Sequence, residues 1–240
     1  MTKPRRAWRR LPEAALLVAL TGCLPAAVTD RGREVAWLYD LFFVAAAIVF
    51  VFVAALIGWS VVRYRGAPGR DVALPEPVHG NLRLEIMWWA LPTALVVLLI
   101  GFTWVVLAQV DAREEEPSLT IEVEGFQWGW RFTYEEADVV VSGTAADPPT
   151  LTLPTERTIA FVITSTDVVH SFSIPAFLIK RDALPTRKNR FDVVIELAGT
   201  YGGQCGEFCG LLHARQLFEI KAVPGDEFDT WLASQARTEP

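Results

Sequence analysis

The residues best suited to chemistry lie in a glycine-rich segment near the C-terminal end of the chain. Within it, Cys205, Cys209 and His213 follow one another at four-residue steps. The neighbouring glycines let the backbone fold closely around a small object. His170, one of three histidines in the chain, lies upstream and offers a second imidazole. Two thiols and two imidazoles are therefore available to one site.

Three kinds of site are compatible with these four side chains. A set of two cysteines and two histidines can hold structural zinc. In an oxidising compartment, Cys205 and Cys209 could instead form a disulfide. Thiolate and imidazole ligands on a β-sandwich also suit copper that carries electrons. Two bridging thiolates would then permit a dinuclear centre in which each copper also takes one histidine. The spacing alone leaves all three open.

The region that must position these residues, from about 117 to 240, has the pattern of an all-β domain. Apolar and polar side chains alternate in short runs that proline and glycine turns separate. The clearest runs are 119–123, 159–163 and 191–195. Short strands at this spacing predict a β-sandwich or barrel. The helical spacing of Phe228, Trp231 and Leu232 predicts a short packed helix at the end.

Two uncharged apolar segments precede this domain and predict a transmembrane helical hairpin over 36–110. They run over 41–62 and 87–110, and at about 1.5 Å of rise per residue each exceeds a hydrocarbon core of about 30 Å. The loop between them is rich in arginine. The positive-inside rule therefore places that loop in the cytoplasm, and both termini and the β domain outside. Aromatic residues suited to the membrane interface flank the spans: Trp37, Tyr39, Trp59, Tyr64, Trp88 and Trp89.

The first 23 residues resemble a bacterial secretory leader, which agrees with this orientation. A basic stretch precedes a short apolar run that ends in Leu20-Thr21-Gly22-Cys23. This is the pattern of a lipoprotein cleavage box, so Cys23 is predicted to carry a lipid anchor in the plasma membrane. The alternative is a leader that stays uncleaved.

Composition excludes several classes of protein. With 52% apolar residues among 240, most of the chain cannot be disordered. Three cysteines are too few for a disulfide scaffold. The formal charge of −6 argues against a nucleic-acid partner. The β domain is itself acidic, with 17 Asp and Glu against 10 Lys and Arg, hence −7. This charge is compatible with ordinary solubility and with steering of a basic partner.

Four stretches of the chain, in order, resemble subunit II of the haem–copper cytochrome c oxidases. They cover essentially everything from the first span onward, and together they are far more specific than any one alone. The stretches are Leu84-Glu85-Ile86-Met87-Trp88-Trp89, Gly125-Phe126-Gln127-Trp128-Gly129-Trp130, Asp167-Val168-Val169-His170-Ser171-Phe172 and Cys205-x-Glu207-x-Cys209-x-x-x-His213.

The resemblance implies a cupredoxin-type outer domain that holds the dinuclear copper centre CuA. In that family pattern Cys205 and Cys209 bridge the coppers, and His170 and His213 are terminal ligands. Glu207 gives its backbone carbonyl to one copper. The carboxylate of Glu207 reaches a magnesium or manganese ion shared with the catalytic subunit.

The resemblance also implies roles outside the copper ligands. Trp128 matches the aromatic residue where electrons arrive from cytochrome c; otherwise it is a core or interfacial tryptophan. Glu85 matches the carboxylate at the entrance of a proton pathway; otherwise it is an interfacial charge that ends the helix. Asp167 would belong to the acidic docking surface. Contacts to the catalytic subunit or to haem propionates are implied for Lys180, Asp182 and Arg187.

One position departs from the family pattern. The family has a methionine three residues after the second histidine, where this chain has Gln216. The only two methionines, Met1 and Met87, lie in the leader and at the cytoplasmic membrane edge. Copper sites accept glutamine or backbone oxygen as axial ligand. Gln216 is thus expected to be a harder ligand or a distant neighbour, with a lowered or redistributed reduction potential.

The sequence therefore predicts a subunit that accepts electrons from a c-type cytochrome at CuA. It would pass them to haem in subunit I, where oxygen is reduced. One alternative is the corresponding subunit of a CuA-type nitric oxide reductase. Another is a non-catalytic, membrane-anchored protein that binds copper or zinc. A quinol oxidase subunit is disfavoured, because those relatives lack the copper cysteines that are present here.

Overall fold

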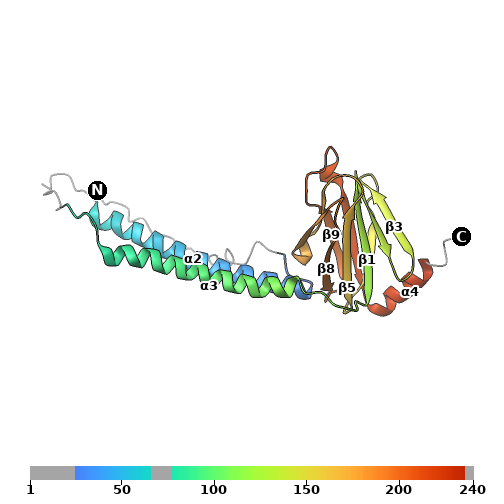
Figure 1. Cartoon of the computed structure of the whole chain (residues 1–240), viewed down its shortest axis with the longest axis horizontal. Coiled ribbons are helices and arrows are strands. Elements are labelled where there is room, and N and C mark those ends of the chain that lie inside the picture. The colour runs from blue at the N-terminus through green and yellow to red at the C-terminus, as the bar shows by residue number, and fades with distance from the viewer. Residues whose placement is uncertain (1–24, 66–76, 236–240) are drawn as a thin grey trace, which may run out of the picture.

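The computed structural model describes residues 25–65 and 77–235, which form a helical hairpin and a β-sandwich (Figure 1). The hairpin consists of α2 (Asp30–Tyr64) and α3 (Leu82–Val110). Helix α2 begins where the side chain of Thr29 accepts a hydrogen bond from Gly32 N. Helix α3 begins where Asn81 accepts from the amides of Arg83 and Leu84. Both are side-chain caps on otherwise unpaired helical N–H groups. The leader and Cys23 lie outside the described residues.

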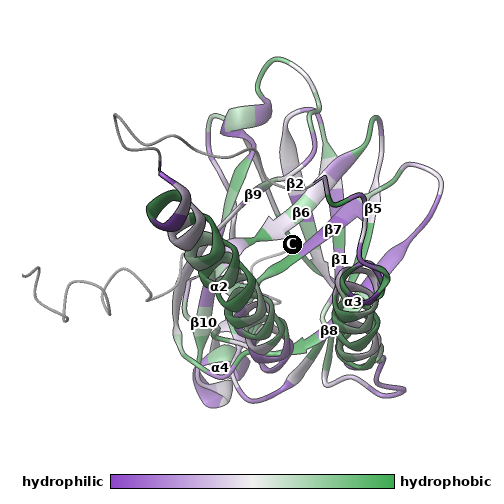
Figure 2. Cartoon of the chain, turned by 90° about the vertical axis from the view of Figure 1, so that its left-hand side faces the viewer, coloured by the Kyte–Doolittle hydropathy of each residue, from purple (hydrophilic) through white to green (hydrophobic). Residues whose placement is uncertain are grey.

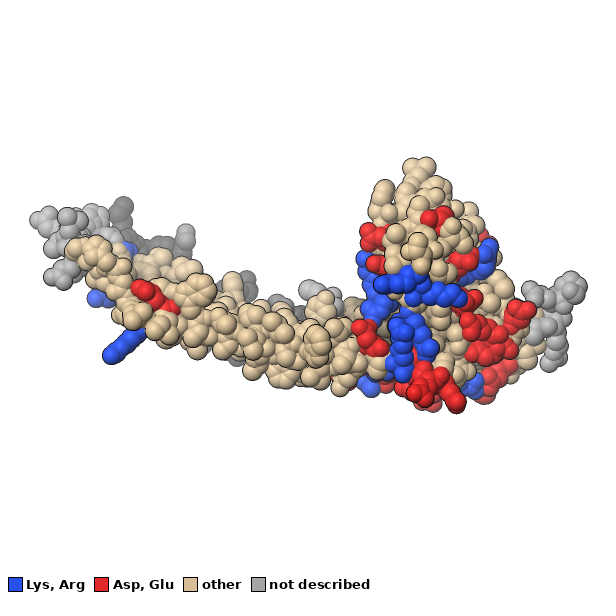
Figure 3. All heavy atoms as spheres, viewed as in Figure 1, with Lys and Arg blue, Asp and Glu red and all other residues tan. Residues whose placement is uncertain are grey.

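The hairpin is long and apolar enough to cross a membrane. Its helices have 35 and 29 residues, and two candidate spans coincide with them. Apolar residues make up most of both helices (Figure 2), and exposed examples include Phe50 and Trp104. No charged side chain lies along the middle of the hairpin on the face drawn in Figure 3. Trp37 and Phe102 pack edge to face between the two helices, with ring centroids 5.8 Å apart. This surface fits lipid or partner helices, as the transmembrane prediction requires.

The predicted β domain is a sandwich of two five-stranded sheets. One has the order β3-β2-β1-β5-β8 and the other β4-β10-β9-β6-β7. The first sheet contains β1 (Leu119–Phe126), β2 (Gly129–Tyr134), β3 (Val139–Thr144), β5 (Thr158–Ser165) and β8 (Asn189–Val194). The second contains β4 (Thr150–Pro154), β6 (His170–Ile174), β7 (Ile179–Ala183), β9 (Gly199–Cys205) and β10 (Leu217–Val223). Two short 3-10 helices, η1 (Pro175–Phe177) and η2 (His213–Arg215), and the terminal helix α4 (Gly225–Gln235) complete the domain.

Aromatic rings from both sheets fill the core. Phe172 stacks on Phe218 at 4.6 Å between centroids, and Phe161 stacks on Phe191 at 4.9 Å. Phe161 and Phe172, from opposite sheets, are themselves 5.5 Å apart. Trp130 packs edge to face against both Phe172 and Phe218. The side chains expected to face inward in the three alternating runs are all buried, which confirms the sandwich prediction: Leu119, Ile121, Val123, Ile159, Phe161, Ile163, Phe191, Val193 and Ile195.

Both outer ends of the hairpin are fastened to strand β8 and the segment after it. Before α2, the carbonyl of Val28 accepts from Glu196 N. At the start of α2, Asp30 Oδ1 accepts from Val194 N at 2.9 Å. After α3, Glu114 N donates to Asp192 Oδ2 at 2.7 Å. The carboxylate of Asp192 is buried and is also paired with Arg190. The β-sandwich is therefore held at a defined place beside the end of the hairpin.

We expect the aromatic core to set the stability of the outer domain. Phe161→Ala should lower the free energy of unfolding by about 3–5 kcal/mol, because it leaves a cavity between the sheets. Val140→Ala on the exposed face of β3 should change it by less than about 0.5 kcal/mol. Denaturant unfolding of the full chain in detergent, followed by tryptophan fluorescence, measures both. Equal stabilities for the two variants would contradict this description of the core.

Candidate metal centre

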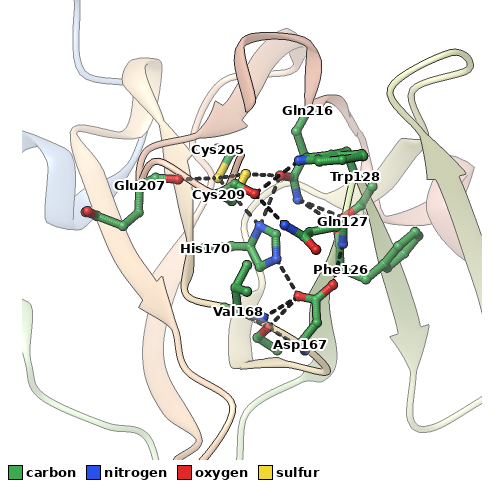
Figure 4. A network of polar contacts seen from close by, with 12 residues as sticks. Phe126, Gln127, Trp128, Asp167, Val168, His170, Cys205, Glu207, Cys209 and Gln216 are labelled. Carbon is green, nitrogen blue, oxygen red and sulfur yellow. Dashed lines mark hydrogen bonds and ion pairs between the residues drawn. The ribbon is translucent and has the colours of Figure 1, made fainter. Parts of the chain in front are cut away.

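The strands and turns at one end of the sandwich bring three of the predicted ligands, His170, Cys205 and Cys209, close together (Figure 4). His170 is the first residue of β6 and Cys205 the last of β9, and these strands are neighbours in which Phe172 pairs with Cys205. Cys209 and His213 follow on the connection from β9 to β10. Gly203 allows the close packing beneath the cluster, because a Cβ there would lie 2.1 Å from the Phe218 ring.

The sulfur and nitrogen atoms of this cluster lie at distances suited to shared metal binding. The ligand atoms of His170, Cys205 and Cys209 all lie within 4.8 Å of one another, and all three residues are buried. The two sulfurs are 3.8 Å apart, and both cysteines are free thiols. Cys205 Sγ is 3.9 Å from His170 Nδ1, and Cys209 Sγ is 3.6 Å from His213 Nδ1. Each sulfur thus lies within 3.9 Å of a histidine nitrogen, although His213 is only partly buried and is not one of the three clustered residues.

The two thiols have pKa values shifted in opposite directions. Burial opposes ionisation of Cys205, but the hydrogen bond with His170 and its other polar contacts outweigh it and lower the pKa of the thiol to about 6. For Cys209, burial and the neighbouring charge of Cys205 raise the pKa to about 12. Burial lowers the pKa of His170, yet its hydrogen bonds to Cys205 and Asp167 raise it overall. A metal cation that displaces the remaining protons would stabilise all these groups in their ligand forms.

Asp167 orients the first histidine. Its Oδ1 lies 2.8 Å from His170 Nε2, while Oδ2 accepts from Gln127 N at 2.7 Å. A carboxylate on one ring nitrogen fixes the imidazole and leaves the other nitrogen for a metal. Sequence reasoning placed Asp167 only on a docking surface; its side chain is partly exposed, so the histidine contact is an addition to that prediction.

The turn between β1 and β2 packs against the cysteine loop, residues 205–213 at the end of β9 and after it. The indole N–H of Trp128 donates to the carbonyl of Cys209 at 3.1 Å, and Gln127 Nε2 donates to the same oxygen at 2.7 Å. Gly210, at φ +115, leaves room for this contact, since a Cβ there would lie 3.2 Å from the Trp128 ring. Trp128 is therefore half-buried against the cysteine loop. Sequence reasoning missed the role of Gln127; its place in the quoted motif beside Trp128 is the signal that could have found it.

Gln216 lies inside the donor cluster. Its side chain is fully buried, and Oε1 is 3.0 Å from Cys209 Sγ and 3.0 Å from His170 Nδ1. The backbone carbonyl of Glu207 is 3.2 Å from the other sulfur, Cys205 Sγ. Two oxygens thus flank the two sulfurs.

The carboxylate of Glu207 points away from the sulfurs (Figure 4). It is paired with Lys180, at 3.3 Å from Oε2 to Nζ, and both side chains are about half exposed. Asp182 lies on β7, and its carbonyl accepts from Asn189 Nδ2. Arg187 donates to the side chain of Asn189. Asp182 and Arg187 lie on the β7–β8 side of the domain, and Asp182 pairs across β6 and β7 with Ser171, the neighbour of His170.

Two further features lie around or away from the centre. Phe208 and Leu211 in the cysteine loop are large apolar residues, yet 78% and 88% exposed. The two side chains form an exposed apolar patch, and their place in a glycine-rich turn was the sequence signal for it.

Glu85 lies far from this centre in the sequence, at the start of α3, where Oε1 accepts a hydrogen bond from Asn81 N at 3.1 Å. This reciprocal contact is a helix cap.

Comparison with known proteins agrees with this architecture. Residues 18–106 match the family model for the transmembrane domain of cytochrome c oxidase subunit II, and residues 144–223 match that for its periplasmic domain. The probable cytochrome c oxidase subunit 2 of Streptomyces coelicolor is 30% identical, with 98% of this chain and 89% of that protein covered. The cytochrome c oxidase subunit 2 of Alkalihalophilus pseudofirmus is 31% identical, with 95% of this chain and 68% of that protein covered.

Among solved structures, the periplasmic domain of subunit II of the cytochrome oxidase of Bradyrhizobium japonicum is 30% identical. The match covers 51% of this chain and 96% of that one, with a TM-score of 0.47. The relatives favour an oxidase over a nitric oxide reductase or a solitary metal-binding protein. The chain belongs to the family of cytochrome c oxidase subunit II, a membrane-bound subunit of a haem–copper oxidoreductase that associates with other oxidase subunits.

Proposed function

We propose that this subunit accepts electrons from a c-type cytochrome at a dinuclear copper centre and passes them to the haem-bearing subunit for oxygen reduction. The observation that carries this proposal is the buried cluster of His170, Cys205 and Cys209, with His213 Nδ1 3.6 Å from Cys209 Sγ. The ligands would be Cys205, Cys209, His170 and His213. The centre would supply reversible one-electron chemistry when copper is bound.

The donor set supports copper better than structural zinc. A structural zinc site is closed by four ligands in a tetrahedron. Here the donors are two sulfurs, two imidazole nitrogens and two oxygens. The oxygens are the backbone carbonyl of Glu207 and the side-chain amide oxygen of Gln216. Mixed sulfur and nitrogen ligands with a weak oxygen suit a copper site that transfers electrons. The residues present therefore fit copper, which Cys205, Cys209, His170 and His213 would hold.

The chain supports a route for electrons through Trp128. The indole is part of the domain surface and is hydrogen-bonded to the carbonyl of a copper ligand, Cys209. Electrons that reach the indole would therefore be one hydrogen bond from the ligand residue. The β1–β2 turn holds this geometry through Gln127, which donates to the same carbonyl.

Two features of the surface support docking of a basic donor: its negative charge and an apolar patch beside the cysteines. The outer domain carries −7 by sequence, and on the face drawn in Figure 3 acidic side chains gather away from the hairpin while basic ones gather beside it. Phe208 and Leu211 supply exposed apolar area close to the cysteines. Long-range charge would steer the cytochrome, and its association rate would then fall with added salt. Asp167 would contribute to this surface as well as orienting His170.

The remaining assignments follow the family pattern. The Glu207 carboxylate would bind magnesium or manganese at the boundary with the catalytic subunit, exchanging its partner Lys180 for the cation. Asp182 and Arg187 would contact that subunit. Glu85 would stand at the cytoplasmic entrance of a proton pathway. Both termini and the copper domain would lie on the periplasmic side of the plasma membrane, with Cys23 as the lipid attachment point.

The full chain loaded with copper should give the near-infrared and EPR spectra of a dinuclear centre. Cys209→Ser removes one bridging sulfur and should leave at most a mononuclear spectrum. Cys23→Ser alters the cysteine outside the cluster and should leave the dinuclear spectrum unchanged. A mononuclear spectrum in the unaltered chain would contradict the proposed centre.

Trp128→Phe should slow electron transfer from a reduced c-type cytochrome. The change keeps a ring but removes the N–H that reaches Cys209. We expect the rate to fall by at least about tenfold, equivalent to about 1.4 kcal/mol of activation free energy. Copper content should be retained, and Trp231→Phe in α4 should transfer electrons at the normal rate. Stopped-flow reduction of the assembled oxidase measures this, and an unchanged rate would leave Trp128 a structural residue.

Glu85→Gln separates proton transfer from helix capping. Glutamine can still accept the hydrogen bond from Asn81 N but cannot ionise. We expect oxygen consumption by the assembled oxidase to fall by about tenfold or more, the loss of a general acid–base group. The helical circular dichroism of the hairpin should not change. Normal turnover in Glu85→Gln would show that the carboxylate serves only as a cap.

A further inference from the structure

The position at which the family places methionine is filled here by an amide with defined partners at both ends. Gln216 follows η2 and directly precedes β10. Its side chain has no exposed surface. Burying an amide without hydrogen bonds is costly, so the contacts at its two ends decide how it is oriented.

The nitrogen end of the amide faces the β1–β2 turn. Nε2 donates to the carbonyl of Phe126 at 3.2 Å and to the carbonyl of Gly129 at 2.9 Å. Backbone carbonyls only accept hydrogen bonds, and an amide nitrogen has two N–H groups to donate. A reversed amide would set its oxygen against both carbonyls. The surrounding hydrogen bonds therefore assign the nitrogen and the oxygen.

The oxygen end consequently faces the metal donors. Oε1 is 3.0 Å from Cys209 Sγ and 3.0 Å from His170 Nδ1 (Figure 4). It lies as near to these donors as the Glu207 carbonyl lies to Cys205 Sγ, at 3.2 Å. An ion that binds His170 Nδ1 and Cys209 Sγ together would have the amide oxygen beside it.

We propose that Gln216 supplies an amide oxygen ligand to the copper centre on the side of His170. The carbonyls of Phe126 and Gly129 hold the amide in that orientation. This inference rests on the proposed copper centre and concerns how this chain completes it. A methionine at the same position would offer a softer sulfur to the metal, and it would leave both carbonyls without their donor.

The two consequences are separable. As a ligand, a hard oxygen favours the oxidised copper, so it lowers the reduction potential relative to a thioether. As a link between the turn and the cysteine loop, the amide acts even without copper: its nitrogen donates to the carbonyls of Phe126 and Gly129, and its oxygen accepts from Cys209 and contacts His170. A purely structural glutamine would contribute the second effect alone.

The test compares the full chain with Gln216→Met, using Gln204→Met as the matched control. Gln204 is the exposed glutamine just before Cys205 on β9. With copper bound, Gln216→Met should raise the reduction potential and change the EPR hyperfine splitting. Without copper, its melting temperature should fall. Gln204→Met should do none of these.

Each outcome tests a different part of the proposal. If the unaltered chain gives a dinuclear spectrum but Gln216→Met changes neither potential nor splitting, the ligand role is wrong. If the melting temperature without copper is also unchanged, the anchoring of the amide is wrong. No dinuclear spectrum in the unaltered chain would instead contradict the proposed copper centre itself.

A second measurement needs no folded variant at position 216. X-ray absorption at the copper edge of the unaltered chain should require two oxygen scatterers, one each for Glu207 and Gln216. A fit satisfied by a single oxygen would overturn the ligand assignment.

Discussion

The pairing of β6 with β9 is the interaction on which the metal cluster depends. It sets Phe172 opposite Cys205, so the histidine that opens β6 comes close to the cysteine that ends β9. A shift of one residue would turn the side chains of either strand to the other face of the sheet. The aromatic core resists such a shift, because Phe172 is packed between Trp130, Phe218 and Phe161. The same ring thus fixes the core and the ligand spacing.

Around the cluster, buried polar groups find partners in a connected network. The carbonyl of Cys209 accepts from Gln127 and Trp128, and the carbonyls of Phe126 and Gly129 accept from Gln216. Side chains of the β1–β2 turn thus donate to the cysteine loop, and Gln216, just after that loop, donates back to the turn. The hydrogen bonds of Gln216 favour one arrangement, because this side chain is fully buried and would be left unsatisfied without them. In the proposed function, such a scaffold would restrict the movement of the ligands when the charge of a bound metal changes.

The sequence predicted those parts of the structure that depend on periodicity and local spacing. Uncharged length predicted α2 and α3, alternation predicted strands such as β1 and β5, and the cysteine and histidine steps predicted the cluster. It could not show which atoms meet across long separations. The contact of Gln216 with Phe126 and Gly129 requires β1, β2 and β10 to converge, although Gln216 is about ninety residues from the turn. Likewise, the contact of Asp167 with His170 depends on the bend before β6, which spacing does not determine.

The anchoring of the hairpin fixes the position of the β-sandwich beside the two spans. Asp30 and Glu114, at the outer ends of the two spans, both bond to β8, an edge strand of the sheet opposite the one that carries His170 and Cys205. Electron transfer to a partner embedded in the same membrane requires the donor site to stay at one height and orientation. A flexible tether would let the centre sample many distances, and the productive one would be only a fraction of them. Attachment through a buried carboxylate, Asp192, together with strand amides restricts the domain instead. The outer ends of the two helices are thus attached to the same sandwich that carries His170 and Cys205.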